Sequence, residues 1–333
     1  MALWMAVEDA VDGLKDGTKE MARRQLGALA LLAESGVPTR WLDPSMEQLD
    51  EDQSHETQWG ADEDAHDALT ELIRRSIVQQ SADGSTTMLH RLQAQVLRES
   101  WSEDEHRAAY ASAAQLLGSV DADRFGRNDT EARRQETRNV IEQLRAISAQ
   151  AYSHCLFDDE QVRSCLSRGL VHAIDLGLPQ DAITLSDAVS IVESIAGPSH
   201  ADALLARNNL AGVYESAGRT EDALALNEQV LVDRTRILGE DHPDTLASRN
   251  NLACAYRSAG RTEEAIALFE QVLIEHTRVL GEDHPHTLTS RSNLARTYLA
   301  AGRTEEAIAL YEQVLIDRTR ILGEDHPDTL ASR

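Results

Sequence analysis

The sequence predicts an all-α protein whose C-terminal part is a solenoid of stacked helix pairs. Three segments around Leu210, Leu252 and Leu294 align without a gap, so this part of the chain repeats itself every 42 residues. A fixed period of this size is typical of a solenoid, in which each unit buries its apolar face against a neighbour. The composition agrees, because 41% of the residues are hydrophobic but only 4% are aromatic, as expected for a long, thin core.

Each unit is predicted to contain two antiparallel helices. In the second unit the first helix spans residues 243–259, because Pro243 suits a first turn, apolar residues follow at helical spacing, and Gly260 stops the helix. The second helix spans residues 262–280, and the hydroxyl of Thr262 is expected to cap its acidic first turn. The sequence Gly-Glu-Asp-His-Pro then turns the chain into the next unit.

These residues resemble the tetratricopeptide repeat, in a 42-residue form similar to that of kinesin light chains. The packing positions of the family fall on Leu252, Ala253, Tyr256, Gly260, Ala265 and Phe269, and in the next unit on Leu294, Ala295, Tyr298, Gly302, Ala307 and Tyr311. Two positions depart from the family pattern. Arginines occupy the bulky position three residues before the Leu, and Asn227 replaces the aromatic residue of the second helix. The arginines suggest a ladder near the groove, and Asn227 a looser contact.

In this family the first helices line a concave groove, and the Asn just before the Leu hydrogen-bonds the backbone of an extended peptide. The resemblance therefore implies a peptide-binding role for Asn209, Asn251 and Asn293, with Asn208 and Asn250 beside them. An Asn side chain offers both donor and acceptor, so such a ladder can satisfy a peptide main chain of any sequence. The alternative is that these asparagines hydrogen-bond the neighbouring repeat.

Specificity is expected where otherwise identical repeats differ. One turn further along the first helices, the three units carry Gly212 and Glu215, Cys254 and Arg257, and Arg296 and Leu299. Residues that pack in the core are expected to be the same in every repeat. The variation at these positions therefore indicates that they line the groove. The candidate basic residues are Arg207, Arg249, Arg257, Arg291 and Arg296. They suggest a protein or peptide partner with acidic side chains or a free carboxylate, because Arg binds carboxylates with two parallel hydrogen bonds. The alternative is a solvated face.

The first 100 residues predict a small winged-helix-like domain. An apolar helix over residues 21–33 is followed by an acidic loop, a second helix over 65–74, and two short strands over 76–80 and 86–90 that form a hairpin. The segment at 88–98, Met-Leu-His-Arg-Leu-Gln-Ala-Gln-Val-Leu-Arg, resembles the one that closes the winged helix of bacterial NB-ARC (STAND) signalling ATPases. That family runs from an ATPase domain through a winged helix to a repeat sensor, and this chain lacks the first part.

Neither catalysis nor a cofactor is predicted. The segment Gly13–Lys19 has too few residues between its glycines for a phosphate loop, and its Thr and Lys are in the wrong order. In the resembling family a His at the position of His90 can contact nucleotide phosphates; here it is expected to be a hairpin-to-helix junction residue. The Glu-Asp-His sets at 240–242, 282–284 and 324–326 lie a repeat apart, too far to share a metal ion.

Charge and hydropathy exclude two further classes. A formal net charge of −25 opposes nucleic-acid binding, which depends on Lys and Arg displacing counterions. No apolar run approaches the roughly 18 residues of a membrane span, and the N-terminus carries acids where a signal peptide needs bases. Cys155, Cys165 and Cys254 have no metal or disulfide spacing and are expected to be buried small residues in a reducing compartment. We therefore predict a cytoplasmic protein.

The predicted domains are a winged-helix-like domain over 1–100, a helical linker region over 101–157, a degenerate repeat over 158–199, and three repeats with the start of a fourth over 200–333. The degenerate repeat rests on two matches to the next unit, Leu176–Ala182 at an offset of 41 residues and Ala196–His200 at 42, so one residue is lost between them. The last repeat keeps the interior pattern, so we expect further repeats or self-association through this open end.

The predicted function is a non-enzymatic protein–protein interaction scaffold, the partner-sensing part of a STAND-type signalling protein that binds an extended peptide in its groove. One alternative is a stand-alone adaptor that bridges two proteins. Another is a transcriptional regulator that acts through the winged helix, although the second helix of that domain offers only Arg74 and Arg75 to DNA.

Overall fold

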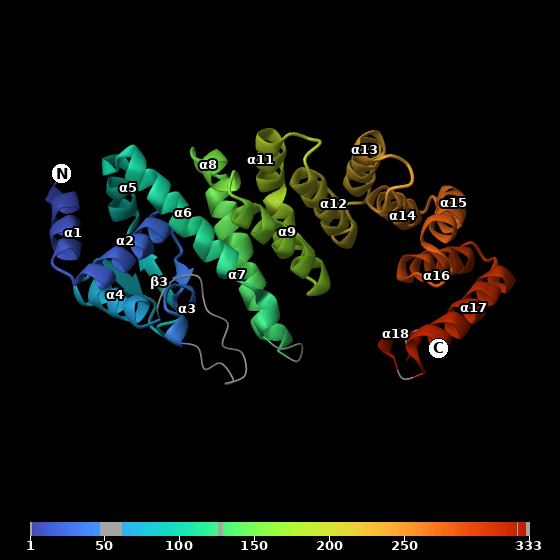
Figure 1. Cartoon of the computed structure of the whole chain (residues 1–333), viewed down its shortest axis with the longest axis horizontal. Coiled ribbons are helices and arrows are strands. Elements are labelled where there is room, and N and C mark those ends of the chain that lie inside the picture. The colour runs from blue at the N-terminus through green and yellow to red at the C-terminus, as the bar shows by residue number, and fades with distance from the viewer. Residues whose placement is uncertain (1, 47–61, 126–128, 325, 331–333) are drawn as a thin grey trace. The chain divides into compact units, whose positions relative to one another are not determined.

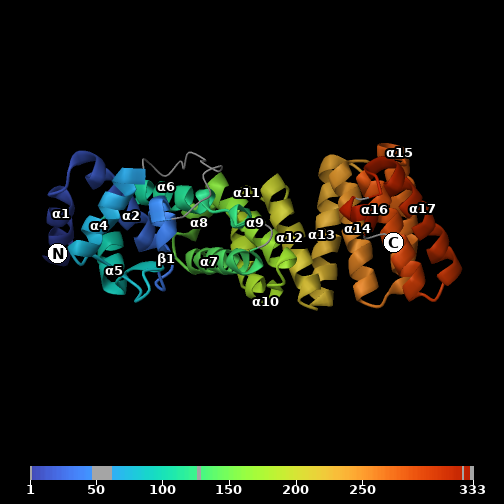
Figure 2. The same cartoon turned by 90° about the horizontal axis from the view of Figure 1, so that it is seen from below.

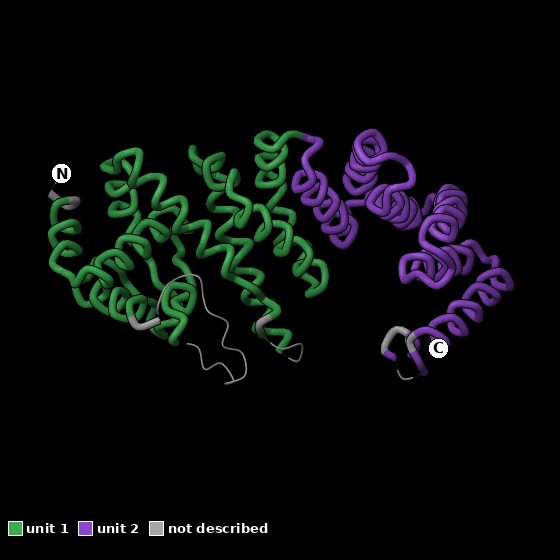
Figure 3. The backbone as a smooth tube through the Cα atoms, in the orientation of Figure 1, with its two compact units in different colours: residues 1–197 green, residues 198–333 purple. Residues whose placement is uncertain are grey.

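The computed structural model describes residues 2–46, 62–125, 129–324 and 326–330. The chain forms two compact units, residues 1–197 and 198–333 (Figure 3). Helices dominate both units, and the strands among the described residues form one three-stranded sheet in the first unit. The predicted all-α fold is confirmed. Most of the acidic loop expected after the first helix lies outside the described residues.

The first unit begins with helices around a small sheet (Figure 1). Its elements are α1 (Ala2–Asp12), α2 (Asp16–Leu31), β1 (Val37–Pro38), α3 (Thr39–Leu42), η1 (Pro44–Met46), α4 (Asp62–Arg74), β2 (Val78–Gln80), β3 (Thr86–Leu89) and α5 (Arg91–Ser100). The strand order is β1-β3-β2, and Val78 lies opposite Leu89. The hairpin is confirmed. Strand β1 could not be predicted, because a two-residue strand that contains a Pro shows no alternation of apolar and polar residues.

The remainder of the first unit is helical. It comprises α6 (Glu103–Ser119), η2 (Ala122–Arg124), α7 (Thr130–Ser148), α8 (Ser153–Phe157), α9 (Glu160–Asp175), α10 (Pro179–Ala182), η3 (Ile183–Leu185) and α11 (Ser186–Ala196). The buried amide of Gln143 ties α7 to the turn before β1: its Oε1 accepts from the Ala33 N–H at 2.7 Å, and its Nε2 donates to the Gly36 carbonyl at 2.8 Å. The stretch between the two sequence matches of the predicted degenerate repeat contains η3.

The second unit consists of consecutive antiparallel helix pairs, whose side-by-side packing is visible in Figures 1 and 2. They are α12 (Ala201–Ser216) with α13 (Thr220–Leu238), α14 (Pro243–Ser258) with α15 (Thr262–Leu280), and α16 (Pro285–Ala300) with α17 (Thr304–Leu322), followed by α18 (Pro327–Leu330). The predicted second helix over 262–280 is confirmed. The first helix of that pair ends one residue earlier than predicted, and Gly260 follows it with φ +73°.

Histidine caps the first helix of each pair. The Nδ1 atoms of His200, His242 and His284 accept hydrogen bonds of 3.2–3.3 Å from the backbone N–H two residues later. This explains the His before Pro243 and before Pro285, and His200 has the same role before Ala201. The predicted cap at Thr262 is wrong, because Thr262 is the first residue of α15, and Arg261 before it makes no side-chain cap. The hydroxyl of Thr262 instead points back to the Gly260 carbonyl, at 3.5 Å.

Neighbouring pairs share one hydrophobic core. A single buried cluster takes Ala253 from α14, Ala265, Ile266 and Phe269 from α15, Leu294 and Tyr298 from α16, and Ala307 from α17. Phe269 is fully buried. Asn227, which takes its place in α13, is buried as well, at 3% exposure. The core therefore runs from one repeat to the next, as a solenoid requires.

The two inner junctions between pairs use different polar contacts. Between α13 and α14, Arg234 donates from Nη1 to the Ser248 hydroxyl at 2.8 Å and to the Asp244 carbonyl at 3.1 Å. Between α15 and α16 the equivalent residue is the buried His276, whose Nδ1 lies 2.8 Å from the Ser290 hydroxyl. The ring of His286, which stands where α14 has Asp244, stacks on His276 at 6.2 Å. Two histidines thus replace an Arg–Asp combination.

We expect acid to destabilise the His276 junction. Burial lowers the pKa of His276, with His286 and His284 adding to the effect and Glu275 opposing it. The unfolded chain then binds more protons at this residue, so its stabilisation is complete above the ordinary histidine pKa near 6.5 and is lost as the pH falls below that value. In thermal melts between pH 7.5 and 5, the wild type should lose about 2–4 °C for each kcal/mol of stability lost.

The matched control is the double variant His276→Arg with His286→Asp, which copies the residues of the α13–α14 junction. Its melting temperature should fall less between pH 7.5 and 5 than that of the wild type. Equal falls in the two proteins would show that acid acts elsewhere.

Candidate functional site

The candidate site is the solvent-facing side of the first helices α12, α14 and α16. We call it the first-helix face; it comprises Asn208, Asn209, Gly212 and Glu215, then Asn250, Asn251, Cys254 and Arg257, then Ser292, Asn293, Arg296 and Leu299. All of these residues are half-buried or exposed. Equivalent positions recur every 42 residues, so the stacking of the helix pairs brings them into rows.

The asparagines form a ladder across the repeats. Asn251 donates from Nδ2 to Oδ1 of Asn208 at 3.0 Å, and Asn293 donates in the same way to Asn250 at 3.2 Å. The alternative that these asparagines hydrogen-bond the neighbouring repeat therefore holds for these two pairs. A primary amide has two N–H donors and an oxygen with two lone pairs, so one such bond does not exhaust it. The ladder fixes the orientation of the amides along the face.

Three of the predicted arginines make ion pairs inside their own repeat. Arg207 pairs with Asp233 at 2.9 Å and Arg291 with Asp317 at 2.5 Å, and Arg249 pairs with Glu275. Their side chains are only 4–11% exposed. The expected ladder of ligand-facing arginines needs correcting, because each guanidinium is directed to an acid on the second helix of its pair. The sequence held the signal, since an acid follows each of these arginines at 26 residues.

The two other arginines lie on the face itself. The Arg257 guanidinium stands 5.8 Å from the ring centre of Phe269, and its Nη1 is a buried donor with no hydrogen-bond partner among the described residues. Arg296 is exposed and donates to Asn293 Oδ1 at 3.3 Å. Both lie near Cys254: burial raises the pKa of this thiol, Arg257 and Arg296 oppose the rise, and Glu215 adds to it. The middle of the face is therefore positive. Of the three cysteines predicted to be buried, Cys165 is buried, Cys254 is half-buried and Cys155 is exposed, so the prediction is wrong for Cys155.

An acid borders this positive region in the first repeat. Glu215 accepts a 2.7 Å hydrogen bond from the Ser258 hydroxyl of the next first helix. In the third repeat the equivalent position is Leu299, which is 52% exposed. The face thus changes from acidic through basic to apolar along one row, while the packing residues beneath it stay nearly constant.

His90 has a local structural role. It follows β3 and caps α5, with Nδ1 accepting from the Leu92 N–H at 3.2 Å. This is the junction position predicted from the sequence.

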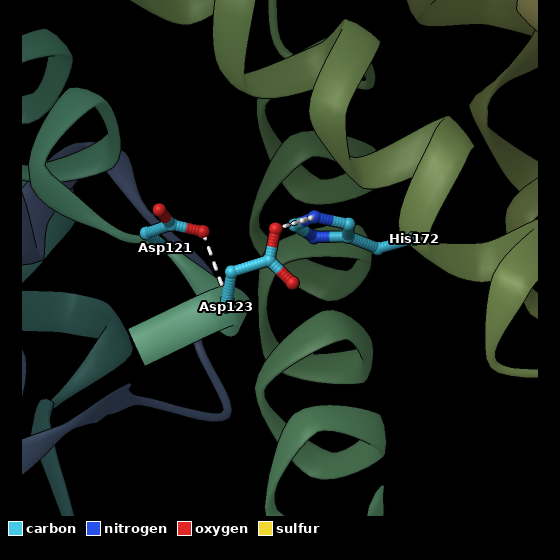
Figure 4. A group of neighbouring side chains, drawn as sticks. All are labelled: Asp121, Asp123 and His172. Carbon is cyan, nitrogen blue, oxygen red and sulfur yellow. Dashed lines mark hydrogen bonds and ion pairs between the residues drawn. The ribbon is translucent and has the colours of Figure 1, made fainter. Parts of the chain in front are cut away.

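The first unit holds one cluster of metal-ligand residue types among the described residues, Asp121, Asp123 and His172 (Figure 4). Asp121 accepts from the Asp123 N–H at 2.9 Å, as the cap of η2. The Asp123 carboxylate lies 2.6 Å from the Arg133 guanidinium and 3.3 Å from Nε2 of His172. An arginine in contact with the central carboxylate supplies the positive charge that a cation would bring, so the group is explained as a structural network.

A cavity of about 250 Å³ lies between α1, α2, α5 and α6. Its walls are largely apolar and include Val7, Leu26, Leu97 and Trp101. Two arginines line it: Arg23 pairs with Glu8 and Asp12, and Arg24 donates to Gln115. No helix in the described part of the chain is long and apolar enough to cross a membrane.

The family profile of the tetratricopeptide repeat matches residues 204–244, 245–286 and 287–328. These are three tetratricopeptide repeats. Each match begins two or three residues after the start of the first helix of a pair and covers both of its helices, and the repeat predicted from the sequence is confirmed for this segment. Tetratricopeptide repeats are typically non-catalytic scaffolds for protein–protein interaction, so this part of the chain is an interaction scaffold.

Several solved structures are similar to the chain. A variant of a putative kinesin light chain with nearly identical repeats from P. anserina is 27% identical with a TM-score of 0.49, over 65% of this chain and 97% of that one. The BtubC protein of P. vanneervenii is 18% identical with a TM-score of 0.46, over 70% and 89%. A STAND protein with a tetratricopeptide repeat sensor from Pyrococcus horikoshii is 12% identical with a TM-score of 0.40, over 98% and 54%. Comparison with curated proteins gave no match.

Proposed function

We propose that the tetratricopeptide repeats bind an extended peptide along the first-helix face and that a carboxylate of this peptide lies between Arg257 and Arg296. The observation that carries the proposal is the buried Nη1 of Arg257, which has no partner among the described residues. A buried donor without a partner costs about 1–3 kcal/mol. A rotation of the half-buried Arg257 side chain toward the face would remove this cost by letting it donate a charge-assisted hydrogen bond to a ligand carboxylate.

The asparagine ladder supports an extended backbone beside this carboxylate. Asn251 and Asn293 each use one N–H to hold the preceding repeat, and the same amide groups border the face. Amides held at each repeat suit a main chain, which offers donors and acceptors at regular spacing along an extended peptide. Arg207, Arg249 and Arg291 support the face from below and are not part of the proposed contact.

We further propose that the chain is the partner-sensing portion of a STAND-type signalling protein. The order of elements supports a winged-helix-like domain at its start: α2, β1, α3, α4 and the β2–β3 hairpin, with β3 in the centre of the sheet. A stand-alone adaptor would use the same repeats. The two differ in whether peptide binding changes the activity of an ATPase domain.

A transcriptional regulator is disfavoured by the contacts of α4. Arg74 and Arg75 both hydrogen-bond the Glu71 carboxylate, and these bonds lower the pKa of Glu71 to about 2. Arg75 also donates to the Ala10 carbonyl. The two basic groups of this helix are therefore neutralised locally, which leaves little positive charge to meet DNA phosphates.

The carboxylate contact can be tested with peptides selected by the full chain from a displayed random library. The selected peptides should be enriched in acidic residues or depend on a free C-terminus. In fluorescence anisotropy, Arg257→Ala and Arg296→Ala should each weaken binding about 10- to 100-fold, because a hydrogen bond to a charged group contributes about 1.5–3 kcal/mol.

The matched control is Arg261→Ala. Arg261 lies in the turn after α14, where it pairs with Glu264 and stacks on Tyr256, away from the first-helix face. This variant should bind within about twofold of the wild type. Selection of peptides without carboxylate preference, or equal losses in all three variants, would contradict the proposal.

A further inference from the structure

A row of exposed aliphatic side chains runs along the second helices of the repeats. Val232, Ile274 and Ile316 occupy the same position of α13, α15 and α17 and are 66%, 68% and 59% exposed. Ile237, Val279 and Ile321 follow five residues later at 36–39% exposure. β-Branched aliphatic side chains that are this exposed in every repeat are not stabilised by the core of their own helix pair. The row indicates an interaction surface.

Charges of opposite sign flank each of these residues. One turn before the aliphatic residue stands an exposed Glu, and one turn after it an exposed Arg; the sets are Glu228-Val232-Arg236, Glu270-Ile274-Arg278 and Glu312-Ile316-Arg320. Residues four apart lie on the same face of a helix, so the three residues of each set lie in line along their helix. We call the three sets the second-helix stripe. Each set is acidic at one end, apolar in the middle and basic at the other end.

We propose that the second-helix stripe is a self-association surface that pairs with the stripe of a second copy of this chain. A two-fold axis parallel to the row of repeats would set each second helix antiparallel to its own counterpart. Ile274 then meets the same residue of the partner copy, and Glu270 faces Arg278 of the partner copy at both ends of the stripe. In this antiparallel arrangement each Glu of one copy therefore faces an Arg of the other copy.

The second copy is the occupant because it satisfies two conditions together. A partner must present apolar groups at the spacing of the repeats, and it must present Arg and Glu in reversed order around each of them. Another copy of the repeats carries both features, and the interface closes with two-fold symmetry because the same patch is used on both sides. Small exposed residues one further turn away, Ala225, Ala267 and Ala309, leave room for close approach of the helices.

The flanking charges keep contacts within their own chain that do not hide the stripe. Arg278 pairs with Asp241 in the turn before α14, and both side chains remain more than half exposed. Glu270 accepts from the Tyr298 hydroxyl at 2.6 Å, and its own side chain is exposed. Both groups are held near their positions and still face solvent, so pairing with a second copy would cost little ordering of side chains.

The test uses the full chain in sedimentation equilibrium over a range of concentrations at low salt. The wild type should show a reversible monomer–dimer equilibrium, and Ile274→Glu should weaken dimerisation at least about 100-fold by placing two like charges at the centre. Glu270→Arg alone and Arg278→Glu alone should each weaken it about tenfold. The double variant should recover it, and so should a mixture of the two single variants, which restores opposite charges at each contact.

The control is Ile308→Glu. Ile308 on α17 is 50% exposed, comparable to the stripe residues, but occupies the position at which Ile266 is buried in the shared core of the preceding repeats. This variant should dimerise like the wild type, and circular dichroism should show unchanged helicity in all variants. A wild type that stays monomeric, failure of the mixed variants to associate, or loss of the dimer through Ile308→Glu and not Ile274→Glu would overturn the proposal.

Discussion

Replacing Phe269 with Ala is expected to destabilise the repeats by about 3–5 kcal/mol, the usual cost of removing a buried aromatic ring. The ring is fully buried in a cluster that takes residues from four successive helices, α14 to α17. Its loss would leave a cavity against Ala253, Leu294 and Tyr298. Because each repeat is stabilised through its neighbours, the cost falls on both adjoining interfaces. Chemical denaturation followed by circular dichroism measures the loss.

Tyr311 provides a position-matched control. It is the equivalent residue of the third repeat but is only half-buried and packs at the edge of the same cluster. Tyr311→Ala should therefore cost clearly less than Phe269→Ala, because less surface is removed from the core. Similar costs for the two substitutions would mean that the ring at this position is not held by the shared core.

The repeats could be predicted in detail because the signal is repeated. The 42-residue period, with Pro and Gly at the helix ends, predicted the second helix of each pair correctly. The burial of Ala253 and Phe269 follows from their positions in the repeat. The hairpin was predictable from its turn. The strand β1 was not, since Val37 and Pro38 have no pattern of their own and pair only when β3 is in place.

The candidate site could be predicted only in part. The asparagines and arginines lie on the predicted helices, but sequence position alone does not tell whether a side chain at the edge of a helix turns to solvent or to the adjacent helix. For Arg207 the deciding residue is Asp233, on another helix, and its only sign in the sequence is that an acid recurs 26 residues after the arginine in every repeat. The Nη1 of Arg257, which has no hydrogen-bond partner in the described part of the chain, lies near Phe269, and this arrangement has no sequence signature.

Replacing Arg249 with Met is expected to cost on the order of 3 kcal/mol, because it leaves the Glu275 carboxylate nearly buried without its cation. The side chains of Arg249 and Glu275 are 11% and 17% exposed, and Gln271 also donates to this carboxylate, at 3.0 Å. The melting temperature should fall by about 2–4 °C per kcal/mol. The double variant Arg249→Met with Glu275→Leu should regain most of this loss, because no buried charge then remains.

A double-mutant cycle in thermal melts separates this structural role from the ligand role that the sequence suggests for Arg249. If the ion pair holds α14 to α15, Arg249→Met lowers the melting temperature, Glu275→Leu lowers it as well, and the double variant is more stable than the sum of the two predicts. The affinity of the double variant for a selected peptide should stay near that of the wild type. If Arg249→Met instead melts like the wild type and loses peptide binding, this arginine belongs to the binding site. Unchanged melting would mean that the guanidinium is not held by Glu275, and it would then be able to reach a ligand.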